Sequence, residues 1–174
     1  MGFVTAEHRA LLGKPGRRQT AANPVSRESL RRLTQGAMEL DPMLWDDEIA
    51  AGTRYGQVVA APLFPLHAFT RAAGAPDPLD KLAADPDWDG SDGGGIRGLA
   101  PLDLPLRRIL NGGTRARFFR LARIGDAIST QSRYVQIEDR EGRSGPMVVV
   151  SIETDYRNQD DELLMRVRST FIWR

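Results

Sequence analysis

Few side chains in this sequence, apart from its carboxylates, are suited to acid–base or nucleophilic chemistry. The 174 residues include two histidines, His8 and His67, and no cysteine. Without cysteine there are no disulfides, thiol nucleophiles or thiolate metal sites. His8 lies in an N-terminal segment that we expect to be poorly anchored. His67 is therefore almost the only histidine available for proton transfer.

The stretch Met38–Asp47, MELDPMLWDD, places carboxylates on both sides of a proline. Asp41 precedes Pro42, and a residue before proline disfavours helical geometry, so a helix should end at Asp41. Taken alone, an Asp-Pro pair is a common helix terminator. Glu39 and Asp41 are therefore candidate acid–base groups only if the surrounding elements place them in a site.

A helix is expected immediately before this stretch. Ser26 is a suitable N-cap, and Val25 and Leu30 have the spacing of a hydrophobic staple around it. Apolar side chains then recur at helical spacing; they are Leu30, Leu33, Ala37 and Leu40. This pattern predicts an amphipathic helix that ends near Asp41.

A second helix is expected in the apolar segment 58–73, and Gly74 is a suitable residue to end it. Large apolar side chains cover nearly every side of this helix, which predicts burial all round. They are Leu63, Phe64, Leu66, Ala68 and Phe69. His67 lies within the same helix, so we expect a hydrogen-bonded core histidine there rather than a base.

The start of this helix has no side chain that can cap it, because Ala60 and Ala61 precede Pro62. Proline has no amide hydrogen, so Leu63 and Phe64 supply the first backbone donors. Such amides can polarise a carbonyl group, helped by the positive end of the helix dipole. The alternative is that they bond to water or to the preceding loop.

Four segments in the C-terminal half alternate between apolar and polar residues, as strands do. They span about 113–121, 127–138, 146–157 and 162–173. The short polar turns between the later segments predict an antiparallel meander. A helix buried on all sides and a sheet with one apolar face are combined most economically when the sheet wraps the helix. The sequence therefore predicts an α+β hotdog fold.

The organisation is expected to be an N-terminal arm, residues 1–24, followed by a single domain, residues 25–174. Within that domain, residues 75–96 contain acidic residues, prolines and three consecutive glycines, and are interpreted as a flexible loop or flap. This segment is either a tolerated insertion or a functional lid over the site.

Several classes of function are disfavoured. A net charge of +1 gives no reason to expect nucleic acid or a membrane surface as the main partner. The longest apolar run is too short to cross a bilayer, and no signal peptide is evident, so a cytoplasmic location is expected. The glycine-rich DGSDGGGIRG lacks the Lys-Ser/Thr end of a phosphate-binding loop. We therefore expect neither a metal ion nor a bound cofactor.

Three stretches resemble the MaoC-like (R)-specific hydratase/dehydratase family, and especially its N-terminal, non-catalytic domain class. They are ELDPMLWDDEIAAGTRYGQVVAAPLF, GGTRARFFRLARIGDAI and EDREGRSGPMVVVSIETDYRNQDDELLMRVRSTFIWR. The last is the most specific, and the resemblance covers residues 25–174. It implies a hotdog domain that handles acyl thioesters.

In catalytic members of that family, an Asp-x-Asn-Pro-x-His segment follows the first helix, and its Asp and His act together on the substrate. Aligned on Pro42, Glu39 takes the place of the Asp, Asp41 that of the Asn, and Leu44 that of the His. Hydration needs one group to activate water and another to protonate the α-carbon, and a leucine does neither. The resemblance therefore implies a degenerate catalytic pair.

Hotdog domains of this family commonly work in pairs in which one member keeps the catalytic residues. The resemblance thus implies an acyl-binding subunit of a heteromeric enoyl-CoA (or acyl-carrier) hydratase or 3-hydroxyacyl-thioester dehydratase. Its expected partner is a homologous catalytic hotdog subunit, in a dimer or a dimer of dimers. The alternatives are a weak stand-alone hydratase that uses Glu39, and a homodimeric acyl-thioester binding protein without turnover.

The expected substrate-binding residues come from two elements. Leu63, Phe64 and His67 belong to the apolar helix, where one or two side chains would line an acyl tunnel. Four arginines are candidates for the phosphates of coenzyme A or phosphopantetheine; they are Arg115, Arg117, Arg120 and Arg123. A solvated strand face is the alternative explanation for their spacing.

Overall fold

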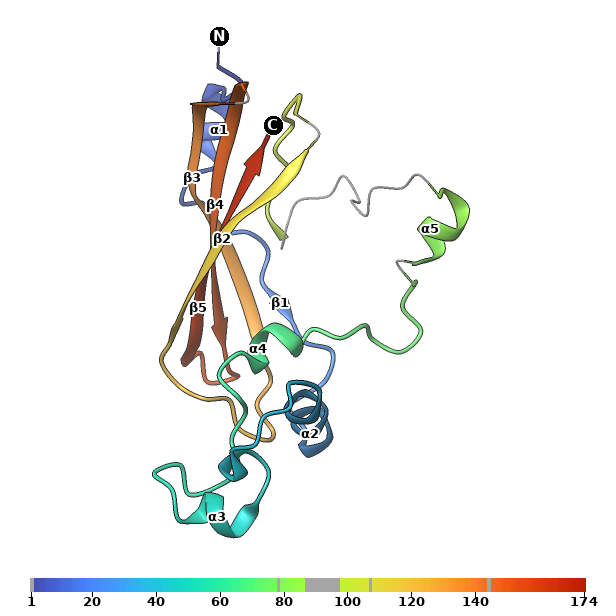
Figure 1. Ribbon diagram of the computed structural model, residues 1–174, viewed down its shortest axis with the longest axis vertical. Coiled ribbons are helices and arrows are strands. Elements are labelled where there is room, and N and C mark those ends of the chain that lie inside the picture. Colours follow the sequence, from blue (N-terminus) through green and yellow to red (C-terminus); the bar gives the residue numbers. More distant parts are fainter. Residues whose placement is uncertain (1, 78, 87–97, 107, 144) are drawn as a thin grey trace.

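The computed structural model of the protein describes residues 2–77, 79–86, 98–106, 108–143 and 145–174. Its principal element is a five-stranded antiparallel sheet with strand order β1-β3-β4-β5-β2 (Figure 1). The strands are β1 (Gln19–Thr20), β2 (Ile109–Phe118), β3 (Ser129–Gly142), β4 (Gly145–Arg157) and β5 (Leu163–Trp173). The four long strands correspond to the four predicted segments, and the α+β class is confirmed.

Strand β2 differs most from its predicted position, because it begins at Ile109 rather than near residue 113. Its pairing with β5 shifts register between Asn111 and Gly113. The Asn111 side chain accepts a hydrogen bond from the Gly113 amide at 2.8 Å, and Gly113 has a φ of 112°. A β-bulge at Gly112 and Gly113 therefore lets the strand continue through residues that are poor strand formers.

The helices are short, and α2, α3 and α4 gather near one end of the sheet (Figure 1). The bounds are α1 (Ala6–Ala10), α2 (Arg27–Gly36), the 3-10 helix η1 (Pro42–Leu44), α3 (Asp47–Ala51), α4 (Phe64–His67) and α5 (Leu79–Ala84). Ser26 caps α2, as predicted, through a hydrogen bond from the Ser29 amide. The helix ends at Gly36, however, so Leu40 lies outside it and is 84% exposed.

One face of the sheet, called here the concave face, carries two hydrophobic clusters. The first lies where α2 and α4 pack and includes Leu30, Phe64 and Tyr156. The second lies toward the N-terminal segment and includes Val4 and Trp173. Strands β3 and β5 bury mostly alternate side chains, as strands with one covered face do. Strand β4 is buried on both faces from Val148 to Ile152, and no side chain of β2 is buried.

The predicted long helix in residues 58–73 is wrong. Val59 instead bridges to Arg123 in extended geometry, and the Ala60 amide donates to the Ala122 carbonyl at 2.8 Å. Only the single turn α4 follows, within which Pro65 has no amide to continue a helical ladder. Phe64 is buried, but Leu63 is 48% exposed and is not covered on all sides.

The N-terminal segment is anchored, contrary to expectation. The Gly13 amide donates to the Tyr134 carbonyl at 2.9 Å, and the Gly16 amide donates to the Ser132 carbonyl at 2.8 Å. Strand β1 continues this contact with β3, and Val4 is buried. Much of the edge of β3 is therefore covered, whereas the outer edge of β2 has no strand beside it in the described part of the chain.

The predicted flap, residues 75–96, falls largely outside the described residues. Its described part includes α5, which has no buried residue. Among the described residues, no helix combines the length and the apolar character needed to cross a membrane.

Candidate acyl-binding site

The segment that the resemblance aligns with the family's catalytic motif folds as a capped turn. The Asp41 carboxylate accepts a hydrogen bond from the Met43 amide at 3.0 Å and so caps η1. The Glu39 carboxylate accepts one from the Asp41 amide at 3.1 Å. Both carboxylates are therefore used to hold the backbone of this turn, which is also what an ordinary Asp-Pro helix terminator does.

Leu44, which the resemblance aligns with the catalytic histidine, is 4% exposed and forms part of the core. It lines a cavity of about 460 Å³ that we call the motif cavity. This cavity lies beside α2 and is lined by Arg27, Leu30, Arg31, Thr34, Gln35, Glu39, Leu44, Trp45 and Val58. Its walls hold one carboxylate and no imidazole, so a complete acid–base pair is not brought together here.

His67 is exposed at the end of α4, so its predicted place in the core is wrong. The error follows from the length of α4, since a four-residue helix does not carry the segment into the interior. His67 lines neither the motif cavity nor the second cavity described below. Glu39 lines the motif cavity, so neither of the two cavities brings His67 and Glu39 together.

The backbone amides at the start of α4 are only partly free. The Phe64 amide donates to the Ala61 carbonyl at 2.9 Å and is engaged within the turn. Leu63 occupies the N-cap position without a side-chain cap, as the sequence predicted. The proposed carbonyl-polarising role therefore does not hold for the Phe64 amide in this structure.

A second cavity, of about 630 Å³, lies where the turns after β2 and β4 meet the segment before α4; we call it the loop cavity. It is lined by Met43, Arg54, Tyr55, Pro62, Phe118, Phe119, Arg120, Leu121, Arg123, Asp126, Asn158, Gln159, Asp160, Glu162 and Leu164. The Arg54 guanidinium lies 4.8 Å from the centre of the Tyr55 ring, and Arg120 pairs with Glu162 at 3.2 Å. Aromatic rings and arginines thus share one opening.

The four candidate arginines divide between two places. Arg120 and Arg123 line the loop cavity. Arg115 and Arg117 lie on the opposite face of the sheet, called here the convex face, and both are exposed. The pairs are separated because Arg115 and Arg117 lie within β2, whereas Arg120 and Arg123 follow its end at Phe118. A joint role for all four in one phosphate site is therefore not favoured by their positions.

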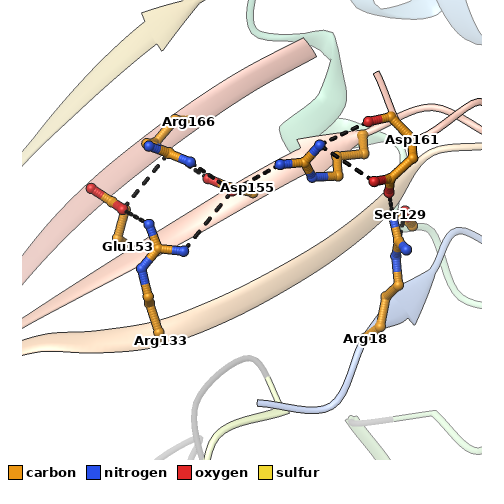
Figure 2. Close-up of polar contacts among 8 residues, drawn as sticks. Arg18, Ser129, Arg133, Glu153, Asp155, Asp161 and Arg166 are labelled. Carbon is orange, nitrogen blue, oxygen red and sulfur yellow. Dashed lines mark hydrogen bonds and ion pairs between the residues drawn. The ribbon is translucent and has the colours of Figure 1, made fainter. Parts of the chain in front are cut away.

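Sequence reasoning missed an ion-pair network on the convex face (Figure 2). Arg166 donates two hydrogen bonds to Asp155, at 2.5 and 2.8 Å, and Arg133 pairs with Glu153. Burial works to raise the pKa of Asp155, but the Arg166 hydrogen bond and the neighbouring guanidinium charges outweigh it and lower the pKa overall. The only sequence signal was the alternation of charge along β4 and β5.

Comparisons with known proteins show which family has a sequence like that of this chain. A family profile described as "FAS1-like, dehydratase domain region" matches residues 13–167. A search of curated protein sequences finds no match.

Three solved structures illustrate the structural likeness. The ChsH1-ChsH2 complex from Mycobacterium tuberculosis includes a chain that is 15% identical, with a TM-score of 0.66 over 91% of this chain and 87% of that one. A MaoC-like dehydratase from Rhodospirillum rubrum is 19% identical, with a TM-score of 0.58 over 91% and 90%. The HadBC (3R-hydroxyacyl-ACP dehydratase) complex from Mycobacterium tuberculosis gives 19% identity and a TM-score of 0.55 over 90% and 95%.

These likenesses confirm the hotdog fold and the MaoC-like resemblance that the sequence predicted. The family profile covers most of the chain, including part of the N-terminal segment that anchors β3. The chain therefore belongs to the FAS1-like dehydratase domain region family.

Proposed function

We propose that this chain is the acyl-binding, non-catalytic subunit of a heteromeric MaoC-type hydro-lyase. The enzyme would add water to an enoyl thioester or remove it from a 3-hydroxyacyl thioester. The family supports a dehydratase type of reaction. The division of labour between subunits, and a cytoplasmic location, are parts of the proposal.

The observation that carries the proposal is the burial of Leu44. At 4% exposure its side chain fills core space, where a histidine would have to face substrate. Glu39 is left as a single carboxylate that already accepts a backbone hydrogen bond. One such group does not supply both the base that activates water and the acid that protonates carbon.

A catalytic partner would have an open surface to bind. The outer edge of β2 is unoccupied within the described chain, and exposed strand edges readily accept another strand. Large apolar side chains are exposed at both ends of β2, with Ile109 at 49% and Phe118 at 48%. The two similar solved complexes that pair ChsH1 with ChsH2, and HadB with HadC, support a homologous hotdog partner.

The substrate is proposed to be a coenzyme A or acyl-carrier thioester. Arg120 and Arg123, which line the loop cavity, would meet the substrate's phosphate groups there, while Arg115 and Arg117 would meet them only from the convex face. Leu63 and Phe64 would contribute apolar walls, and His67 a polar group at the end of α4. On the concave face of β2, Thr114 and Phe118 are exposed, and this open face would accommodate a bulky acyl group.

The test is hydration of a short and a long enoyl-CoA. Rates are measured for this chain alone, for a homologous subunit with an intact Asp-x-Asn-Pro-x-His segment encoded beside it, and for the mixture. Activity that requires the mixture, and disappears when the partner's motif histidine is replaced by alanine, supports the proposal. Substantial hydration by this chain alone refutes it.

A further inference from the structure

The convex face of the sheet carries an arginine-rich band that crosses β3, β4, β5 and β2. The register places two rows of residues side by side across these strands. One row is Arg133, Glu153, Arg168 and Arg115, and the next is Gln131, Asp155, Arg166 and Arg117. The band therefore holds five arginines and two carboxylates, although the whole chain has a net charge of only +1.

The two carboxylates of the band are already engaged on its inner side. Asp155 accepts two hydrogen bonds from Arg166 (Figure 2). It also lies 3.4 Å from Arg157. Glu153 pairs with Arg133 and lies 3.7 Å from Arg166. The charge of the inner arginines is thus compensated within the subunit.

The outer side of the band is not compensated in this way. Arg115, Arg117 and Arg168 are exposed, and none forms an ion pair with another described residue. Arg115 lies directly opposite Arg168, and Arg117 lies directly opposite Arg166. Like charges directly opposite each other in neighbouring strands are destabilising. Arg117 also lies over the Phe119 ring, 5.7 Å from its centre. The sheet therefore ends, at its open edge, in positive charge that no carboxylate of the described residues pairs with.

A second copy of the chain would not relieve this charge. Residues directly opposite in an antiparallel pair lie on the same face, so Arg115 and Arg117 would meet convex-face residues of a copy's β2. That strand, Ile109–Phe118, contains no aspartate or glutamate. Pairing centred on Ala116 would set Arg115 against Arg117 of the copy. In any other antiparallel register of the two β2 strands, Arg115 and Arg117 of both copies still lie on the same face, with no carboxylate from either strand.

We propose that Arg115 and Arg117 select the partner at the β2 edge. The edge accepts a strand that presents aspartate or glutamate opposite these two positions, and it discriminates against a second copy of this chain. The inference deepens the proposed function, since it gives the chemistry of the partner's strand and the reason for a heteromeric enzyme. Edge hydrogen bonds supply affinity, and the charges supply specificity.

A charge swap tests this without knowledge of the natural partner. The double variant R115E/R117E places carboxylates on an otherwise identical edge strand. It is mixed in equal amounts with the wild-type chain and studied by sedimentation velocity at low and high salt. The expected result is a 1:1 complex in the mixture, at least about tenfold weaker at high salt, with no such complex in either protein alone.

Two controls separate specificity from general charge attraction and from misfolding. The variant R9E/R17E changes the net charge equally, but both arginines are exposed on the N-terminal segment; its mixture with wild type should not associate. R115E/R117E should fold, with an unchanged or higher Tm, because the two introduced carboxylates would face Arg168 and Arg166 in place of like charges.

Three results would overturn the inference. The first is a stable wild-type homodimer that R115E/R117E leaves unchanged. The second is the absence of a complex in the swapped mixture. The third is a loss of affinity for coenzyme A in R115E/R117E without a mixed complex, which would assign the arginines to phosphate binding. None of these uses a hydration rate, so failure here and failure of the proposed function are distinguishable.

Discussion

One carboxylate oxygen of Glu39 accepts a hydrogen bond from the Asp41 backbone amide at 3.1 Å. The contact makes Glu39 a structural residue of the turn that leads into η1. Glutamine keeps an acceptor oxygen at the same place. We therefore expect Glu39→Gln to change the hydration rate of the assembled enzyme by less than about twofold, whereas loss of a true acid–base group costs about 100-fold or more. Steady-state rates of the mixed subunits check this, and a 100-fold loss would make Glu39 catalytic.

Leu44 should contribute to stability rather than to chemistry. Leu44→Ala removes a side chain that is 4% exposed, and we expect the free energy of unfolding to fall by about 3 kcal/mol. Leu40→Ala is the matched control, because Leu40 is 84% exposed and its loss should cost less than about 0.5 kcal/mol. Urea denaturation followed by tryptophan fluorescence measures both. Equal effects would mean that the segment is not packed as described.

The lowered pKa of Asp155 predicts how the free energy of unfolding changes at acidic pH. A carboxyl group whose pKa is lower in the folded state stabilises the fold fully above its unfolded value of about 3.9, and less as the pH falls toward the folded value. Asp155→Asn should lower the free energy of unfolding by roughly 2 kcal/mol at neutral pH, because it weakens the charged hydrogen bonds from Arg166.

The difference between wild type and Asp155→Asn should narrow as the pH falls below about 4. Asp47→Asn serves as the control, since the Asp47 side chain is 69% exposed and pairs with Arg27 at the surface. Chemical denaturation at a series of pH values would disagree with this account if the difference widened in acid.

The N-terminal segment should be required for a stable, monodisperse chain. Deleting residues 2–16 removes the hydrogen bonds from Gly13 and Gly16 to β3 and the buried Val4 side chain. We expect a lower Tm and concentration-dependent association through the uncovered β3 edge. Thermal scanning and light scattering measure these, with Lys14→Ala, at an exposed position, as the control. A deletion variant as stable as wild type would show that the segment is dispensable.

The sheet was predictable from sequence because its alternation reflects contacts made within the chain. Strand residues such as Val150 and Ile152 face the core, and the pattern records that burial directly. The apolar segment 58–73 was misinterpreted for the opposite reason. Leu63 and Phe69 are apolar yet exposed. Hydrophobic periodicity does not distinguish burial in a subunit's own core from burial by another molecule.

Other features of the fold left no comparable pattern in the sequence. The N-terminal segment holds β3 largely through backbone amides, such as that of Gly16, which require no periodic side chains. The arrangement of charges on the convex face depends on strand register, which places Arg115 beside Arg168 although they are far apart in sequence. The degenerate position of Leu44 was visible in sequence, but its burial required the fold.

The most direct test of the central claim is a titration of activity. A fixed amount of the homologous catalytic subunit is mixed with increasing amounts of this chain, and enoyl-CoA hydration is measured at each ratio. A chain that lends a binding surface but no catalytic group should raise the rate to a plateau at one equivalent and show no activity alone. A rate that continues to rise in proportion to added chain, or hydration by the chain alone, would contradict the account.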